Sequence, residues 1–187
     1  MKVLLDANVI MTFITGREDK FRNESITVMQ KCINGELQGF VAFHTISILW
    51  YLLRHCDHED SLAWLRLVCK SLTVTSVDNA RLIEAIDNNQ FNDFKDNLQD
   101  CCAQHIGADY IVTSNVRHYT GHSTVRAVTP TELLDIIINN EYEINNESSL
   151  EIQENHVIYH PIPQTKPFHP HRHIILKENN HHFVMNN

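Results

Sequence analysis

This chain opens with the segment Val3-Leu4-Leu5-Asp6-Ala7-Asn8-Val9-Ile10. Its first three residues form an uninterrupted apolar run, which predicts a strand that is buried on both faces. Asp6 follows directly, at the carboxyl end of that strand. Open α/β sheets bind their ligands outside the carboxyl ends of the strands, so Asp6 is the first candidate site residue.

Strand-like and helical patterns alternate along the chain as far as residue 138. The strands are predicted at residues 2–5, 39–43, 72–77, 110–113 and 125–128, and the helices at residues 8–15, 21–34, 45–55, 61–71, 79–87, 94–106 and 132–138. An alternation of this kind is typical of an α/β fold with a central parallel sheet and helices on both of its faces.

A second acidic cluster, Asp93-Phe94-Lys95-Asp96, stands at the start of the helix predicted at residues 94–106. Helix N-termini and the carboxyl ends of neighbouring strands meet in one crevice of such a sheet, so Asp93 and Asp96 are expected near Asp6. Mg²⁺ is usually held by one or two carboxylates together with waters and substrate phosphates. Asp6 and Asp96 are therefore predicted as metal ligands, with Asp93 holding a water of that metal or a second ion.

Three further polar residues are expected around this metal. Asn8 and Asn115 follow predicted strands and are predicted to orient waters. Lys95 is either a phosphate contact or a solvent-facing lysine of the helix. Structural roles compete with the functional ones, because Asp93 suits an N-cap, Asp96 benefits from the helix dipole and Asn115 is common in turns.

The composition of the 187 residues sets further limits. A net charge of −8 argues against a broad basic surface for nucleic acid. An acidic chain can act on RNA if bound cations screen its carboxylates, and it would then need either a small basic rim or a partner. No apolar stretch approaches the roughly 20 residues of a membrane span. The N-terminus shows no leader of the secretory type, and the five cysteines match neither a zinc site nor a disulfide framework. A cytoplasmic protein with reduced thiols is expected.

The composition changes at about residue 140, where Asn, Glu, Ser and His become frequent. The chain is predicted to comprise a globular domain at residues 1–139 and a His-rich extension at residues 140–187, which is either a β-arm or partly disordered. Strand-like pieces of the extension lie at residues 155–160 and 172–177. On a strand, His169, His171 and His173 would share one face, either as solvated histidines or as ligands of Zn²⁺ or Ni²⁺.

Four segments of the sequence carry a resemblance to a known family. They are Val-Leu-Leu-Asp-Ala-Asn-Val-Ile (3–10), His-Thr-Ile-Ser-Ile-Leu-Trp-Tyr-Leu-Leu-Arg (44–54), Asp-Phe-Lys-Asp-Asn-Leu-Gln (93–99) and Ala-Asp-Tyr-Ile-Val-Thr-Ser-Asn-Val-Arg-His-Tyr (108–119). With these motifs in this order, the chain resembles PIN-domain proteins of the PilT N-terminus type, which include the VapC-like toxins of bacterial toxin–antitoxin pairs.

The resemblance implies a three-layer α/β/α sandwich and an endoribonuclease that hydrolyses RNA phosphodiesters with Mg²⁺ or Mn²⁺. The first acid of the family matches Asp6, and the acid on the late helix matches Asp96, with Asp93 beside it. Besides RNA, the implied partners are an antitoxin protein and a second copy of the chain in a homodimer.

The sequence departs from the family pattern at several acidic positions. No acid lies between residues 44 and 56, where many members carry Glu or Asp. Lys95 stands in place of a frequent Glu, Asn115 in place of the usual Asp, and His118 in place of a further acid. These departures motivate an alternative, a PIN fold that has lost catalysis and acts as an RNA-binding or protein-interaction module.

Overall fold

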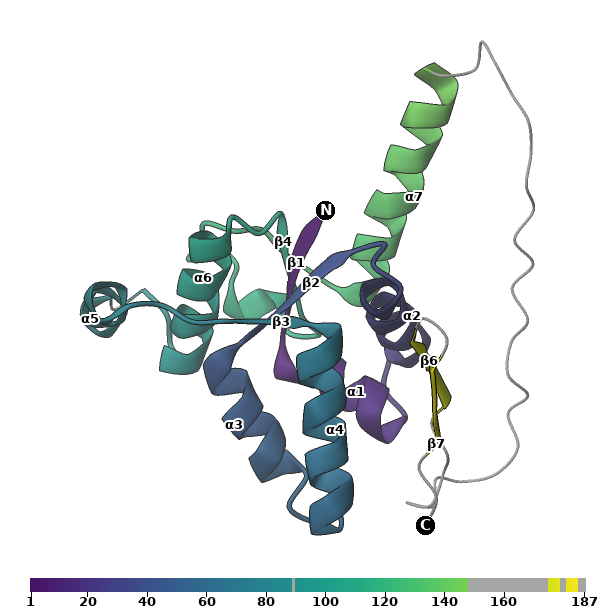
Figure 1. Ribbon diagram of the computed structural model, residues 1–187. Coiled ribbons are helices and arrows are strands. Elements are labelled where there is room, and N and C mark those ends of the chain that lie inside the picture. Colours follow the sequence, from purple (N-terminus) through teal and green to yellow (C-terminus); the bar gives the residue numbers. More distant parts are fainter. Residues whose placement is uncertain (89, 148–174, 179–180, 185–187) are drawn as a thin grey trace. The chain divides into compact units, whose positions relative to one another are not determined.

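The computed structural model describes residues 1–88, 90–147, 175–178 and 181–184, and the chain divides into two units, Met1–Leu150 and Glu151–Asn187. The first unit alternates strands and helices in the predicted order (Figure 1). Its strands are β1 (Lys2–Leu5), β2 (Gln38–Ala42), β3 (Thr73–Thr75), β4 (Tyr110–Val112) and β5 (Ala127–Val128). Its helices are α1 (Ala7–Thr15), α2 (Arg22–Ile33), α3 (Phe43–Leu52), α4 (His58–Ser71), α5 (Asn79–Asp87), α6 (Phe94–Ile106) and α7 (Pro130–Glu147).

The strands of the first unit form one parallel sheet in the order β3-β2-β1-β4-β5. β1 is the central strand, and the chain builds outward from it first on the β2 side and then on the β4 side. The direction of strand addition therefore reverses between β1 and β4. This switch point is where an open α/β sheet forms its ligand crevice.

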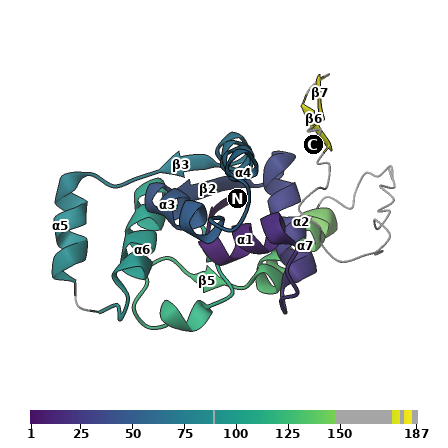
Figure 2. The same ribbon diagram turned by 90° about the horizontal axis from the view of Figure 1, so that it is seen from below.

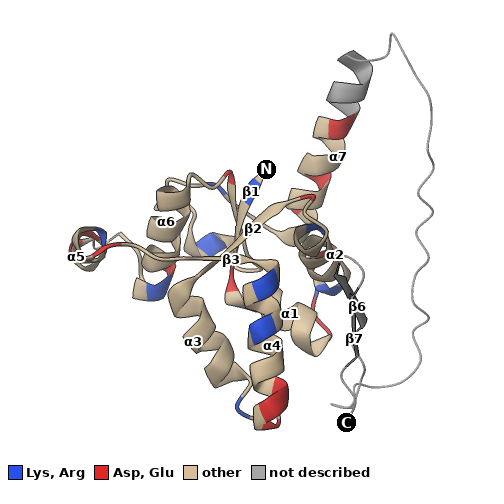
Figure 3. Cartoon of the chain, in the orientation of Figure 1, with Lys and Arg blue, Asp and Glu red and all other residues tan. Residues whose placement is uncertain are grey.

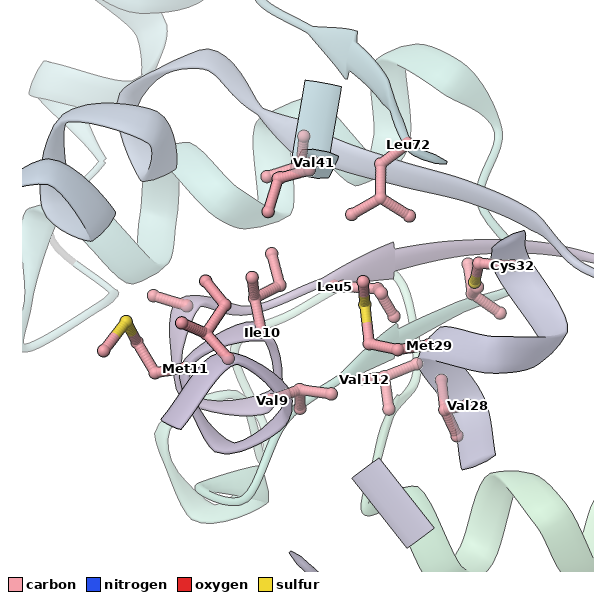
Figure 4. Close-up of a cluster of buried hydrophobic side chains, with 14 of the residues drawn as sticks. Leu5, Val9, Ile10, Met11, Val28, Met29, Cys32, Val41, Leu72 and Val112 are labelled. Atoms are coloured by element: carbon pink, nitrogen blue, oxygen red, sulfur yellow. The ribbon is translucent and has the colours of Figure 1, made fainter. Parts of the chain in front are cut away.

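The side chains of β1 alternate between two hydrophobic cores, one on each face of the sheet. Val3 and Leu5 contribute to a larger core with residues of α1, α2, α4 and α7, part of which is shown in Figure 4. Leu4 contributes to a smaller core with Cys102 and Ala103 of α6. Because both faces of the sheet are covered, the expected three-layer α/β/α sandwich is confirmed.

The helices around the sheet form pairs that both views show. α2 and α7 lie side by side, and α5 lies beside α6 away from them (Figures 1 and 2). The carboxyl ends of the strands lie at the lower edge of the sheet in Figure 1, where α3 and α6 begin. This edge holds the candidate site residues.

Several element boundaries lie at residues whose types favour helix ends. α1 and α6 end at Gly16 and Gly107, whose φ angles of 57° and 60° are left-handed and suit glycine. The side chain of Asp78 accepts a hydrogen bond from the backbone of Arg81, as an N-cap of α5 should. α7 is longer than predicted and reaches Glu147, because residues 139–147 contain no Gly or Pro that would stop it.

The second unit contains a two-stranded antiparallel sheet of β6 (Ile175–Glu178) and β7 (His181–Val184). β6 overlaps the strand predicted at residues 172–177, whereas β7 was not expected from the sequence. The predicted strand at residues 155–160 and the three alternating histidines, His169, His171 and His173, lie outside the described residues.

Two further properties of the described residues bear on the expectations from composition. The five cysteines are free thiols, of which Cys32 and Cys102 are buried and Cys69 is exposed. None of the helices in the described part of the chain combines the length and the apolar character that a membrane span requires.

Candidate active site

Asp6 lies at the switch point of the sheet, between the end of β1 and the start of α1. Its carboxylate accepts hydrogen bonds from the backbone N–H of Ala7 (2.6 Å), the side-chain amide of Asn8 (2.7 Å) and the hydroxyl of Thr113 (2.7 Å). The bond from Ala7 makes Asp6 the N-cap of α1. Three donors therefore fix the orientation of this carboxylate.

Asn8 and Thr113 connect the ends of β1 and β4. The Asn8 amide nitrogen also donates to the Thr113 hydroxyl (3.0 Å), and its amide oxygen accepts the backbone N–H of Ser114 (3.0 Å). The Thr113 hydroxyl also accepts the backbone N–H of Asn115 (3.1 Å). Both the amide nitrogen and the amide oxygen of Asn8 thus have hydrogen-bond partners within the protein. Asn8 contacts the site through Asp6.

The start of α6 carries the second acidic cluster. The side chain of Asp93 accepts the backbone N–H of Lys95 (3.0 Å) and so caps the helix. The Lys95 ammonium lies 3.0 Å from the Asp93 carboxylate and 2.7 Å from that of Asp96. Asp96 is buried, with 7% of its side chain exposed, whereas about half of each of the other two side chains is exposed. Acidic and basic segments accordingly lie together where α6 begins (Figure 3).

Two histidines flank Asp96. The Nδ1 atom of His118, at the end of a 3-10 turn η1 (Val116–His118), lies 3.1 Å from the second carboxylate oxygen of Asp96. His44, in the first turn of α3, lies beside the backbone of Lys95, and burial lowers the pKa of its imidazole. The N-terminus of α3, which carries no acid, therefore brings an imidazole of lowered pKa next to the start of α6.

The carboxylates of Asp6 and Asp96 interact electrostatically. Burial raises the pKa of Asp6, the hydrogen bonds from Thr113 and Ala7 lower it, and the negative charge of Asp96 raises it further. A cation near both groups would favour their ionised forms.

A buried hydroxyl close to these acids has no partner among the described residues. Tyr119 is 3% exposed, its ring packs edge-on against Phe91, and its hydroxyl forms no hydrogen bond there. Burial raises the pKa of this phenol, and the charges of Asp6 and Asp96 raise it further, so it stays a neutral donor. A donor in this position leaves a hydrogen bond open for a water or a ligand atom.

A comparison with models of protein families identifies the family of this chain. The family model described as PIN domain matches residues 2–117. The chain belongs to the PIN domain family. The resemblance inferred from its sequence motifs is thereby confirmed. A search of curated proteins finds no match to this PIN domain.

Solved structures share the fold of this PIN domain. VapBC-1 from nontypeable Haemophilus influenzae is 15% identical with a TM-score of 0.52, and the match covers 70% of this chain and 99% of that chain. VapBC2 from Rickettsia felis, bound to a DNA fragment from their promoter, is 13% identical with a TM-score of 0.53, covering 69% and 98% of the two chains. At such identities the likeness establishes the α/β fold.

Asp6 and Asp96 of this PIN domain are acidic side chains that interact electrostatically. Within the described residues, His, Cys, Asp and Glu side chains form no group of three or more that could hold a metal ion. Asp6 and Asp96 offer oxygen atoms, and Mg²⁺ in proteins commonly takes one or two carboxylates plus waters and phosphates. The unpartnered hydroxyl of Tyr119 suits a water bound nearby. The pair therefore fits a hard divalent cation, with the ammonium of Lys95 as a competing positive charge.

The predicted site residues occupy different positions in the structure. Asp6 contacts Asn8, and Asp93, Lys95 and Asp96 contact one another. Asn115 is exposed and meets this network through its backbone N–H rather than its amide.

Four residues of the site were not predicted as site residues, and one of them, His118, stood only as a departure from the family pattern. Thr113 had a signal, since it is a polar residue at the end of an apolar strand. His44 had a weaker one, because it opens a family motif. Tyr119 closes another family motif, but an aromatic residue at that position is equally suited to a core.

Proposed function

We propose that this chain is a metal-dependent endoribonuclease of the VapC type, in which Asp6 and Asp96 hold Mg²⁺ or Mn²⁺ and Asp93 assists them. Membership of the PIN domain family supports the proposal. One observation carries it further: three hydrogen bonds orient the carboxylate of Asp6 at the switch point, while the charge of Asp96 acts on it. Two such carboxylates suit a hard divalent cation.

A bound Mg²⁺ or Mn²⁺ would polarise a phosphoryl oxygen of RNA and lower the pKa of a bound water. The residues of the chain prepare the position for this chemistry. Thr113 and Asn8 fix the orientation of Asp6. His118 contacts the second oxygen of Asp96 and restricts its rotation.

The remaining predicted residues would act on RNA or on the attacking water. Asn115 is exposed beside the buried Thr113, where its amide can reach a substrate. Lys95 supplies a half-exposed ammonium next to the acids. Since the chain is acidic overall, an RNA phosphate needs such a local positive charge as well as the metal.

Cleavage of a labelled single-stranded RNA tests the proposal. The wild-type chain is expected to cleave it with Mg²⁺ or Mn²⁺ and to stop when EDTA is added. Asp6→Asn and Asp96→Asn are each expected to lower the rate about a hundredfold or more, the scale on which one preorganised electrostatic group acts. Asp135→Asn removes an exposed acid of α7 and is expected to leave the rate unchanged. A rate in Asp6→Asn equal to that of the wild type would overturn the proposal.

A second function, a PIN fold that binds RNA or protein without cutting, is favoured by the contacts of Asp96. Both of its carboxylate oxygens already have partners in Lys95 and His118. RNA binding that persists in EDTA, together with Mn²⁺ binding that is the same in the wild type and in Asp96→Asn, would support this function over the ribonuclease.

We further propose an antitoxin protein and a second copy of the chain as partners. The fold shared with VapBC-1 and VapBC2 supports the first partner. Exposed apolar side chains on α3, among them Phe43 and Tyr51, leave surface that a protein contact would bury. Light scattering of the purified chain measures its molar mass, which tests whether it forms a homodimer. Co-expression with the protein encoded next to its gene, followed by co-purification, tests whether the two proteins form a complex.

A further inference from the structure

We propose that Lys95 is a built-in competitor of the divalent cation. Its ammonium holds the cation position between Asp93 and Asp96, and a divalent ion binds Asp96 only by displacing it. This inference rests on the proposed metal site and adds to it a residue that sets the affinity of that site.

The geometry of the ammonium supports this competition. The Lys95 Nζ atom lies 2.7 Å from one oxygen of Asp96 and 3.0 Å from one oxygen of Asp93, which are the lengths of charge-assisted hydrogen bonds. The other oxygen of Asp96 contacts His118 at 3.1 Å. A divalent ion at about 2.1 Å from Asp96 would lie within a few ångströms of the ammonium, where the two like charges repel strongly.

Of the two partners, the lysine is the one able to move. Lys95 has 49% of its side chain exposed and a flexible aliphatic stem, whereas Asp96 has only 7% exposed. Displacement would therefore swing the ammonium toward solvent and leave the buried carboxylate in place for the metal. The displaced ammonium would still lie at the rim of the site, where it can donate a hydrogen bond to a phosphate of RNA.

The burial of Asp96 explains why a lysine is useful in the metal-free protein. A buried carboxylate without a counter-charge destabilises a fold, and Asp6 adds a second negative charge close by. The ammonium of Lys95 neutralises Asp96 until a divalent ion replaces it. The chain would thus exchange one cation for another rather than fill an empty position.

Lys31 provides a matched control for this role. Its ammonium, in the last turn of α2, also lies 2.7 Å from a carboxylate, that of Glu36, which follows the helix and is half exposed. Exposed pairs of this kind contribute little to stability. Lys31→Gln removes the same charge and the same ion-pair distance without touching Asp93 or Asp96.

Isothermal titration with Mn²⁺ on EDTA-stripped protein tests the inference. Lys95→Gln is expected to bind Mn²⁺ about tenfold more tightly than the wild type, because a positive charge a few ångströms away is removed. Lys31→Gln is expected to bind as the wild type does, and Asp96→Asn to lose affinity with and without Lys95→Gln. Thermal unfolding gives a second measurement: Lys95→Gln should melt at a lower temperature than the wild type in EDTA and gain more from Mn²⁺.

The outcomes separate this inference from the proposed function. Mn²⁺ binding by the wild type that depends on Asp96, with equal or weaker binding by Lys95→Gln, would overturn the inference and leave the ribonuclease proposal intact. Binding by Lys95→Gln but not by the wild type would support the inference and overturn metal dependence of the natural chain. No binding by either protein would overturn both.

Discussion

The hydroxyl of Thr113 donates a hydrogen bond of 2.7 Å to the carboxylate of Asp6, across 107 residues of sequence. Asp6 follows β1 and Thr113 follows β4, and these strands are neighbours in the sheet. Burial raises the pKa of Asp6, and the bond from Thr113 counteracts this effect. Thr113 therefore acts as a positioning residue that orients a proposed metal ligand and favours its ionised form.

Replacing this hydroxyl should weaken metal binding. Thr113→Val keeps the shape of the side chain and removes the hydrogen bond to Asp6. Mn²⁺ affinity is expected to fall about tenfold, the lower end of the range for residues that orient a metal ligand. Stability is expected to fall by about 1 kcal/mol in urea unfolding, because the polar groups around a fully buried hydroxyl lose their partner. Thr27→Val, which removes a hydroxyl bonded only within its own helix, is the control. Lower stability with unchanged Mn²⁺ affinity would limit Thr113 to a role in the fold.

Gln99 fixes α6 against the sheet one turn after Asp96. It is 2% exposed, its amide nitrogen donates to the backbone oxygen of Leu5 (3.2 Å), and its amide oxygen accepts from the hydroxyl of Thr45 (3.3 Å). The Leu5 carbonyl immediately precedes Asp6. The separation of the two proposed metal ligands therefore depends on this buried amide.

Removing the amide should affect both stability and the site. Gln99→Leu leaves the Leu5 carbonyl and the Thr45 hydroxyl unpaired, which is expected to lower the free energy of unfolding by about 1–3 kcal/mol. Mn²⁺ affinity should fall as well, because Asp96 shifts with α6. Thr45→Val breaks only the second bond and should weaken stability while largely sparing Mn²⁺ binding. If the two variants lose Mn²⁺ affinity equally, the contact with Leu5 does not set the ligand geometry.

The sequence was informative about features that neighbouring residues decide, such as strands, caps and helix ends. The apolar run before Asp6 predicts a buried strand, and the Asp at the start of a helix predicts a cap, which is the observed role of Asp93. Glycine after a helix predicts a left-handed stop, as at Gly107. These inferences need only neighbouring residues, so they hold without knowledge of the tertiary structure.

The contacts among the site residues were beyond the reach of such patterns. Lys95 could be assigned to a phosphate or to solvent, but its ion pairs with Asp93 and Asp96 depend on side-chain rotamers at the first turn of α6. The approach of His118 to Asp96 depends on how the loop after β4 folds over α6. Such geometry is set by packing between distant segments, which local sequence does not specify.

Gly39 in β2 shows the same dependence on packing. A methyl group at this position would lie 2.5 Å from Leu72 and 2.7 Å from the Cys32 sulfur, two residues of the larger core that are labelled in Figure 4. Gly39→Ala is expected to lower the free energy of unfolding by about 1–3 kcal/mol through overpacking. In urea unfolding, the losses from Gly39→Ala and Leu72→Ala should be less than additive, because the second variant makes room for the methyl group. Additive losses would show that the strand does not pack this tightly.

Tyr119 allows a test of the unpartnered hydroxyl beside the acids. Tyr119→Phe removes a buried donor that has no partner in the described part of the chain and leaves the ring against Phe91 in place. At neutral pH and without metal, stability is expected to stay the same or to rise by up to about 1 kcal/mol. A loss of stability would mean that the hydroxyl has a bound partner, such as a water.

The pH dependence of the same pair of proteins tests the electrostatics around that hydroxyl. Burial and the charges of Asp6 and Asp96 raise the pKa of Tyr119 above its ordinary value of 10.0, so folding favours the neutral phenol. In the unfolded chain the phenol ionises above about pH 10, and the folded state cannot gain that ionisation until a higher pH. The stability that Tyr119 contributes is therefore complete below pH 10 and is lost as the pH rises further.

Urea unfolding at pH 7, 9, 10 and 11 should show the wild type losing stability relative to Tyr119→Phe only at the two highest values. A constant difference across this series would mean that the phenol ionises as easily in the fold as in the unfolded chain, which would contradict its placement among buried acids.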